Sequence, residues 1–105
     1  MGQPEDAVVK SFVKAVKKSF PTCRIFLFGS RAQGRAKIDS DYDFLLVSPQ
    51  FRKLDWEKRS ATVYHLKRNI PAAMDLLCYT PEEFERKKKQ IGIVQQAVKE
   101  GIELK

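Results

Sequence analysis

The chain has 105 residues and a mass of 12.1 kDa, a length that suits one domain and excludes two separate cores of ordinary size. Hydrophobic residues make up 43% and charged residues 31%, which indicates a folded globule and excludes a disordered chain. The formal net charge of +7 attracts polyanions, nucleotides and acidic protein surfaces alike, so charge alone selects no partner.

The sequence favours a protein of the cytoplasm. No apolar run approaches the roughly 20 residues that span a bilayer. The N-terminal segment contains Pro4, Glu5 and Asp6 instead of a basic region followed by an apolar stretch. Cys23 and Cys78 stand alone in the sequence, so we expect two buried thiols in a reducing compartment, and no membrane as a partner.

The first half of the chain predicts a helix and two strands. Apolar residues at helical spacing predict an amphipathic helix from Pro4 to Phe20, with Pro4 in its first turn. An unbroken apolar run over 24–28 predicts a strand that is buried on both faces and stops at Gly29. A short helix-compatible piece over 31–36 then leads to a second strand over 41–47, acidic in its first half and apolar in its second.

The second half predicts a third helix with Asp55 as its N-cap, closed by Asn69 and Pro71, and a third strand over 73–79. The run from Thr80 to Glu83 has the pattern of a capping box and should start another helix. Together these elements predict an α+β fold of mixed α/β character, in which a small mixed β-sheet packs with helices in a single domain over residues 1–105.

Two glycines should interrupt the last part of the chain. Gly92 is expected to break the helix before a final helical stretch to about Glu100, and Gly101 suits a left-handed helix end before a short strand over 102–104. The apolar cluster of Ile91, Ile93 and Val94 is assigned to the core, with a docking face for a partner as the alternative. His65, the single histidine, is expected at the surface.

Three aspartates are the candidate catalytic residues. Asp41 and Asp43 are two apart on a strand, so their side chains leave the same face with Cα atoms about 6.5 to 7 Å apart. Asp75 lies within an apolar run, where an ionised carboxylate is costly unless it is paired or binds a metal. Oxygen ligands of this kind suit Mg²⁺, and three acids on neighbouring strands predict a two-metal site. Surface aspartates that decorate a turn remain the alternative.

Two familiar motifs are excluded by spacing. The run from Asp39 resembles the start of an EF-hand loop, but Phe44 stands where glycine is needed and Gln50 where a bidentate glutamate is expected. Gly29 and Gly34 imitate a Walker A loop, yet Arg35 and Ala36 replace the lysine and hydroxyl residue of that motif. What remains is a Gly29-Ser30 turn after a buried strand, which can hold phosphate oxygens at the start of a short helix.

The run Gly29-Ser30, ten residues, Asp41-x-Asp43 and a later isolated Asp75 resembles the polymerase-β-like nucleotidyltransferase superfamily, and most of all its minimal nucleotidyltransferase (MNT) family. The stretch FGSRAQGRAKIDSDYDFLLV, residues 28–47, carries this signature. The resemblance implies a nucleotidyltransferase fold in which Asp41 and Asp43 bind two Mg²⁺ ions with nucleotide present. It also implies that Asp75 completes the metal site beside the acceptor hydroxyl, and that Gly29 and Ser30 hold the triphosphate.

The resemblance further implies transfer of AMP from ATP to a hydroxyl, with pyrophosphate leaving. Many MNT proteins resemble the antitoxin of a toxin-antitoxin pair whose partner is a helical HEPN protein that is adenylylated on a tyrosine. Larger relatives add a helical domain that binds the acceptor and the base, so we expect the acceptor of this chain on a partner protein or in a homo-oligomer. Arg31, next to the turn, is included among the nucleotide-binding residues because its charge can assist phosphate binding.

Two other functions stay open at this stage. The first is a catalytically idle binding module that neutralises a helical partner by contact. The second is a basic nucleic-acid-binding domain, which the sequence favours least because it shows no aromatic RNA-binding signature and no helix-turn-helix.

Overall fold

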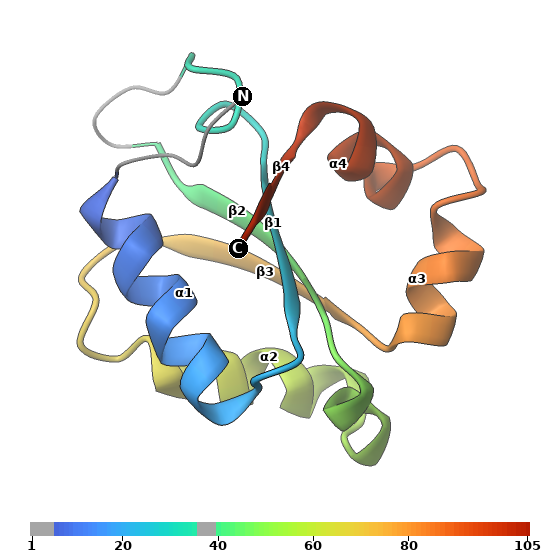
Figure 1. The fold of residues 1–105 in the computed structure, drawn as a ribbon, viewed down its shortest axis with the longest axis horizontal. Helices are drawn as coiled ribbons and strands as arrows, with labels where there is room; N and C mark the ends of the chain where they lie inside the picture. The colour runs from blue at the N-terminus through green and yellow to red at the C-terminus, as the bar shows by residue number, and fades with distance from the viewer. Residues whose placement is uncertain (1–5, 36–39) are drawn as a thin grey trace.

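The computed structural model describes residues 6–35 and 40–105 (Figure 1). Within them the chain forms α1 (Ala7–Ser19), β1 (Arg24–Phe28), β2 (Tyr42–Val47), the 3-10 helix η1 (Pro49–Lys53), α2 (Trp56–Leu66), β3 (Met74–Tyr79), α3 (Pro81–Lys87), α4 (Ile93–Glu100) and β4 (Ile102–Leu104). The predicted order of helices and strands is confirmed except for the short helix expected over 31–36, of which the described residues 31–35 form a turn. Only η1 is additional to the prediction, and it begins at Pro49 after the Ser48 side chain caps its first turn.

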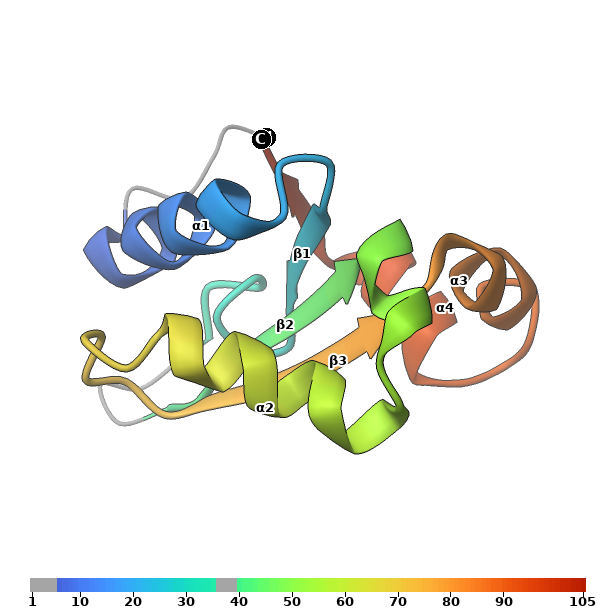
Figure 2. The same ribbon diagram turned by 90° about the horizontal axis from the view of Figure 1, so that it is seen from below.

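The strands form one mixed sheet in the order β3-β2-β1-β4. β1 runs antiparallel to β2 and to β4, whereas β2 and β3 are parallel and are joined by the crossover through η1 and α2. Helices α1 and α2 cover one face of this sheet, and α3 and α4 cover the other (Figures 1 and 2). The α+β prediction with a small mixed sheet is therefore confirmed.

The face under α1 and α2 holds the larger apolar core. Phe12 of α1 packs on Phe44 of β2 with ring centroids 4.3 Å apart, and both side chains are fully buried. Side chains alternate along a strand, so the same face also receives Leu46 from β2 and its neighbours from β1 and β3. The other members include Val9, Val16, Ile25, Leu27, Val63, Met74, Leu76 and Cys78.

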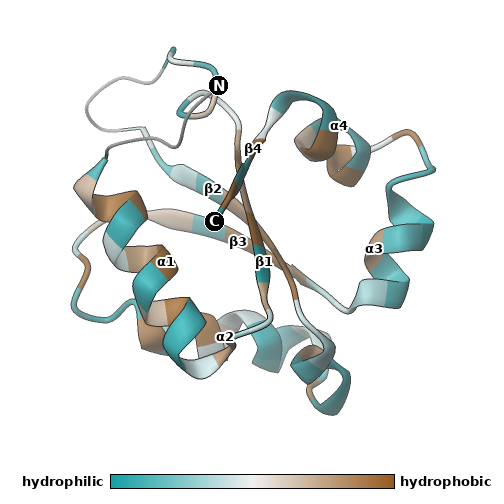
Figure 3. Cartoon of the chain, in the orientation of Figure 1, coloured by the Kyte–Doolittle hydropathy of each residue, from teal (hydrophilic) through white to brown (hydrophobic). Residues whose placement is uncertain are grey.

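The face under α3 and α4 holds a smaller apolar cluster made of Phe26, Leu45, Val47, Tyr79, Phe84, Val94 and Ala97. The capping box at the start of α3 is confirmed: the Thr80 hydroxyl accepts from the Glu83 amide at 3.2 Å, and the Glu83 carboxylate accepts from the Thr80 amide at 2.8 Å. Apolar stretches line the strands and the inner sides of the helices, while hydrophilic residues lie outward (Figure 3).

Several helix ends differ from the prediction. α1 begins at Ala7, because the Asp6 carboxylate accepts from the amides of Val8 and Val9 at 2.7 and 3.3 Å, and Pro4 lies outside the described residues. α2 does begin after Asp55, without a side-chain cap bond, but ends at Leu66 and so stops short of the predicted Asn69.

The prediction of a left-handed Gly101 is wrong, since its φ of −87° and ψ of 179° are extended backbone. A Cβ at this position would lie 2.3 Å from the Ala97 carbonyl oxygen and 2.7 Å from that of Leu27. Glycine is therefore needed because the chain passes very close to α4 and β1, and not because of its backbone angles.

The core assignment at the Gly92 break holds for one residue of three. Val94 is buried, but Ile91 is 99% exposed and Ile93 52% exposed, because the break turns both side chains outward. Cys23 and Cys78 are free and buried as predicted, and burial raises the pKa of each thiol to about 12. His65 is exposed on α2, also as predicted. No helix in the described ranges has the length and apolar character to cross a membrane.

Candidate active site

The strand register brings Asp43 and Asp75 together. In the parallel pair of β2 and β3, the Cα atoms of Asp43 and Asp75 are direct partners, so both side chains leave the same face of neighbouring strands. That face is the one under α3 and α4, because Asp43 alternates in step with Leu45 and Val47. Asp41 lies just before β2 with its side chain exposed, two residues from Asp43.

Burial and like charge act together on Asp43. Burial is the main cause that raises the pKa of the Asp43 carboxyl, and the charge of Asp75, a hydrogen bond with Asp75 and the charge of Asp41 raise it further. Asp75 is the exposed member of the pair, although the sequence suggested that its carboxylate would be buried. The desolvated carboxylate is that of Asp43, because β3 is the edge strand and its Asp75 end is open to solvent.

The glycine turn lies directly against this carboxylate. Phe28, the last residue of β1, is the antiparallel partner of Asp43, so Gly29 follows at the same edge of the sheet. Gly29 has a φ of +73°, and a Cβ there would lie 2.3 Å from Oδ2 of Asp43. Both the left-handed backbone and the contact with Asp43 therefore require glycine at this position.

Ser30 opens a tight turn in place of the predicted short helix. The amides of Ala32 and Gln33 donate to the Gly29 carbonyl at 3.2 and 3.3 Å, and the Arg35 amide donates to the Ser30 carbonyl at 2.9 Å. These bonds fix the segment after β1 beside Asp43 without forming a regular helix. The turn therefore positions Ser30 next to the glycine that lies against Asp43, so the residues predicted to bind phosphate lie beside a predicted metal ligand.

Arg31 is directed to the other side of the sheet. Its guanidinium lies over the Tyr42 ring, 3.9 Å from the centroid, and its Nη2 donates to the Ser40 carbonyl at 2.8 Å. Tyr42 itself faces the core under α1 and α2 and donates to the Asp6 carboxylate at 2.7 Å. Arg31 therefore helps to hold the segment that leads into β2. Its guanidinium does not lie on the face of the sheet that carries Asp43 and Asp75.

The donor set suits a divalent cation, although the three acids are not gathered into a finished metal site. Among the residues that the structure describes, no group of three acidic, histidine or cysteine side chains is positioned to hold a metal ion. Burial and the two acidic neighbours of Asp43 disfavour its ionised form and so raise its pKa. A cation among these oxygens would relieve that repulsion, which is the physical sense in which the residues fit Mg²⁺.

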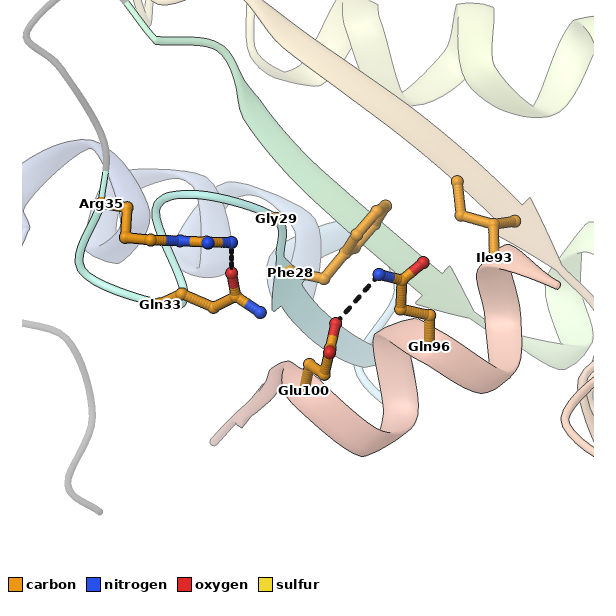
Figure 4. Close-up of a pocket in the computed structure, with 7 residues that line it drawn as sticks. All are labelled: Phe28, Gly29, Gln33, Arg35, Ile93, Gln96 and Glu100. Carbon is orange, nitrogen blue, oxygen red and sulfur yellow. Dashed lines mark hydrogen bonds between the residues drawn. The ribbon is translucent and has the colours of Figure 1, made fainter.

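A cleft of about 570 Å³ opens beside the glycine turn. It is lined by Phe28, Gly29, Gln33, Arg35, Ile93, Gln96 and Glu100 (Figure 4). The loop after β1 forms one wall and α4 the other, with Phe28 between them. Sequence reasoning did not assign the α4 residues to a site, because only the packing of α4 on β1 brings them there. The apolar Ile93 beside the Gly92 break was the one sequence feature that could have indicated this wall of the cleft.

Fold and site together define a small α+β protein with a glycine turn set against paired carboxylates. Residues 9–104 match the family model of the nucleotidyltransferase domain. The chain belongs to this family. No curated protein is significantly similar in sequence.

Solved structures support the same fold. A crystal structure described as a nucleotidyltransferase is 19% identical, with a TM-score of 0.64 over 95% of this chain and 100% of its own. A toxin-antitoxin crystallised with AMP-PNP is 24% identical, with a TM-score of 0.63 over 90% of this chain and 69% of its own. BolA1 from Arabidopsis thaliana, 20% identical over 74% of this chain and 96% of its own, reaches a TM-score of 0.60, so this likeness concerns the fold alone.

Proposed function

We propose that the protein transfers AMP from Mg-ATP to a hydroxyl on a partner protein, as the antitoxin of a pair with a helical HEPN-type toxin. The observation that carries the catalytic part is the meeting of Asp43, Asp75 and Gly29 at one edge of the sheet. The family match supports a nucleotidyltransferase, and the toxin-antitoxin neighbour with AMP-PNP supports the nucleotide and the kind of partner.

In this proposal Asp41, Asp43 and Asp75 hold two Mg²⁺ ions, which supply neutralising charge for the triphosphate and activation of the hydroxyl. Gly29 leaves room for the substrate phosphates because it has no side chain, and Ser30 adds a hydroxyl and amide beside them. Asp75, on the open edge strand, faces the side from which a protein hydroxyl can approach.

The reaction forms a bond between the acceptor oxygen and the α-phosphorus and breaks the bond from that phosphorus to the bridging oxygen. Pyrophosphate leaves, and the hydroxyl proton passes through the carboxylates to solvent. Most of the work of the protein in such a transfer is positioning and charge stabilisation, which rigid strands and a fixed turn provide.

The test follows radiolabel from the α-phosphate of ATP to the candidate toxin. Wild-type protein should transfer label only with Mg²⁺, and Asp43→Asn should lower the rate on the order of 10²-fold or more, because one of the charged ligands is lost. Asp55→Asn, an exposed aspartate at the start of α2, is the matched control and should transfer normally. Label transfer that survives the double change Asp41→Asn and Asp43→Asn would exclude the proposal.

A binding module that silences a helical partner by contact is the second candidate. The exposed side chains of Ile91 and Ile93 favour this function, because exposed apolar side chains at a break between two helices are common in binding surfaces. This function predicts that toxicity is still neutralised by the double asparagine variant and is lost with Ile91→Ser, a change outside the cleft beside Gly29. The catalytic function predicts the reverse pattern.

A further inference from the structure

Two side chains of α2 cover the outer edge of β3, the strand that carries Asp75. β3 is the last strand of the sheet, with β2 as its neighbour on the inner side. On the outer side, the Tyr64 hydroxyl donates to the Met74 carbonyl at 2.7 Å, and Nη1 of Arg59 donates to the Cys78 carbonyl at 3.3 Å. Backbone groups that point outward from an edge strand have no further strand to pair with, so these side chains take the place of one.

The Tyr64 hydroxyl bonds to the backbone on both sides of Asp75. Besides its bond to the carbonyl of Met74, it has a hydrogen bond with the backbone of Leu76. A hydroxyl has one proton, which Tyr64 already donates, so the donor of the second bond is the Leu76 amide. A residue of a parallel neighbouring strand would bond to the same two backbone groups. One side chain therefore fixes the edge strand at the residue between them, which is Asp75.

The Tyr64 phenol also lies close to the carboxylates of the candidate site. Burial is the main cause that raises the pKa of Tyr64, the charge of Asp75 is the next largest cause that raises it, and the charge of Asp41 contributes less. Tyr64 is 41% exposed, so it contributes less to the core than the buried tyrosines Tyr42 and Tyr79 do. Its hydroxyl is therefore better explained by the support of β3 than by packing.

Asp75 needs this support more than Asp43 does. Asp43 lies on β2, which has a strand on either side, whereas Asp75 is exposed and is the second residue of an edge strand. The ends of edge strands open locally more easily than central strands do. A metal ligand has to be held in place by the groups behind it, and loss of such a group commonly lowers metal affinity about 10-fold or more.

We propose that Tyr64 is a positioning residue of the candidate active site. Its hydroxyl fixes the backbone at Asp75, so that this carboxylate can share a divalent cation with Asp43. The inference rests on the proposed nucleotidyltransferase function and adds to it a residue that acts through Asp75.

The experiment counts Mn²⁺ ions bound to the full chain by electron paramagnetic resonance, with one equivalent of a non-hydrolysable ATP analogue present. Mn²⁺ replaces Mg²⁺ because it prefers the same oxygen ligands and gives a signal. The wild type should bind a first Mn²⁺ with the phosphates and a second, weaker one that needs Asp75. Tyr64→Phe keeps the ring and should weaken the second about 10-fold. Tyr79→Phe, the same change at the other end of β3, is the matched control and should bind as the wild type does.

A double change separates positioning from a general effect on the fold. If Tyr64 acts through Asp75, adding Tyr64→Phe to Asp75→Asn should weaken the second Mn²⁺ no further, whereas independent effects add. Hydrogen exchange without metal or nucleotide provides a second measurement. The amides of Asp75 and Leu76 should exchange faster in Tyr64→Phe than in the wild type, while that of Leu45 on the central strand β2 should not change.

The inference is overturned if Tyr64→Phe binds the second Mn²⁺ as tightly as the wild type does, if its effect adds to that of Asp75→Asn, or if exchange at Asp75 and Leu76 is unchanged. The proposed function survives each of these results as long as Asp75→Asn itself weakens the second Mn²⁺. If Asp75→Asn binds like the wild type, or if the wild type binds no second Mn²⁺, the proposed two-metal site fails together with the inference.

Discussion

The two faces of the sheet use the same strands for different purposes. On the face under α1 and α2, β2 contributes Phe44 and Leu46, and the apolar core reaches both side chains without interruption. On the face under α3 and α4, the same strand contributes Leu45 and Val47 to a cluster that stops at Asp43. One face is closed by packing, and the other ends in carboxylates beside an open cleft.

This difference shows where the molecule can accept a ligand. Stability comes mainly from the closed face, because fully buried aromatic side chains contribute the most on burial. On the other face the apolar cluster ends at Asp43, and the acidic side chains of Asp41, Asp43 and Asp75 lie there together. Changes on the closed face should therefore affect folding, whereas changes at the edge with Asp43 should affect ligands more than folding.

The largest expected effect is on the closed face. Phe44→Ala should lower the free energy of unfolding by about 3–5 kcal/mol, because it removes a fully buried ring that packs on Phe12. Phe28→Ala, at the half-buried end of the other face, should cost clearly less. Urea unfolding of both variants measures the difference, with Phe44→Leu as a milder change if Phe44→Ala does not fold. Equal losses would contradict the contrast between the faces.

Next in size is the effect of replacing a glycine at the site. Gly29→Ala and Gly34→Ala both place a side chain at a positive φ, +73° and +71°, which costs about 1–2 kcal/mol. Only Gly29→Ala also meets Asp43, since nothing lies within 4 Å of a Cβ at Gly34. Gly29→Ala should therefore lose more stability and should also lose Mg-ATP binding in calorimetry. If Gly29→Ala binds Mg-ATP as well as Gly34→Ala does, Gly29 is not part of the site.

A smaller effect is expected where Tyr42 anchors the approach to β2. Tyr42→Phe removes a hydrogen bond to the Asp6 carboxylate and should lower the free energy of unfolding by about 1–2 kcal/mol at neutral pH. Tyr64→Phe removes a bond of the same length to the neutral Met74 carbonyl and should cost less. Thermal unfolding of the two variants side by side provides the comparison, and a larger loss for Tyr64→Phe would oppose it.

The smallest expected effect is a gain in stability instead of a loss. Because burial and the neighbouring acids raise the pKa of Asp43 in the folded state, the folded protein binds this proton more tightly than the unfolded chain does. Stability of the metal-free protein should therefore fall as pH rises from the ordinary pKa of a carboxyl through the raised value. Asp43→Asn should raise the Tm at neutral pH and flatten this part of the pH profile.

Thermal unfolding in EDTA at pH 4 to 8 measures both changes. Asp55→Asn, at an exposed position, should leave the profile as it is in the wild type. A lower Tm for Asp43→Asn than for the wild type at neutral pH would show that Asp43 stabilises the fold, contrary to the expectation.

The fold followed from local patterns, and the site did so in part. The capping box at Thr80 and the break at Gly92 are local features, so both were predictable. The three aspartates and the glycine turn were named from the sequence, but their meeting depends on the register of β2 on β3, which no local pattern sets.

Three features were beyond sequence reasoning for the same reason. The exposure of Asp75 depends on β3 being an edge strand, and the direction of Arg31 depends on Tyr42 and Ser40. The α4 wall of the cleft depends on how α4 packs on β1. In each case tertiary contacts between distant segments decide the outcome, whereas periodicity reports only on one segment at a time.

The Asp6 carboxylate links the first turn of α1 to the start of β2. It accepts from the Val8 and Val9 amides and from the Tyr42 hydroxyl, and Arg31 lies 4.0 Å away over the same ring. Ligand binding at Asp41, Asp43 and Asp75 should therefore slow the hydrogen exchange of the Val8 and Val9 amides, although these amides lie away from the three aspartates. An affinity tag fused close to Asp6 would disturb this reporter, so a tag is better placed at the C-terminus.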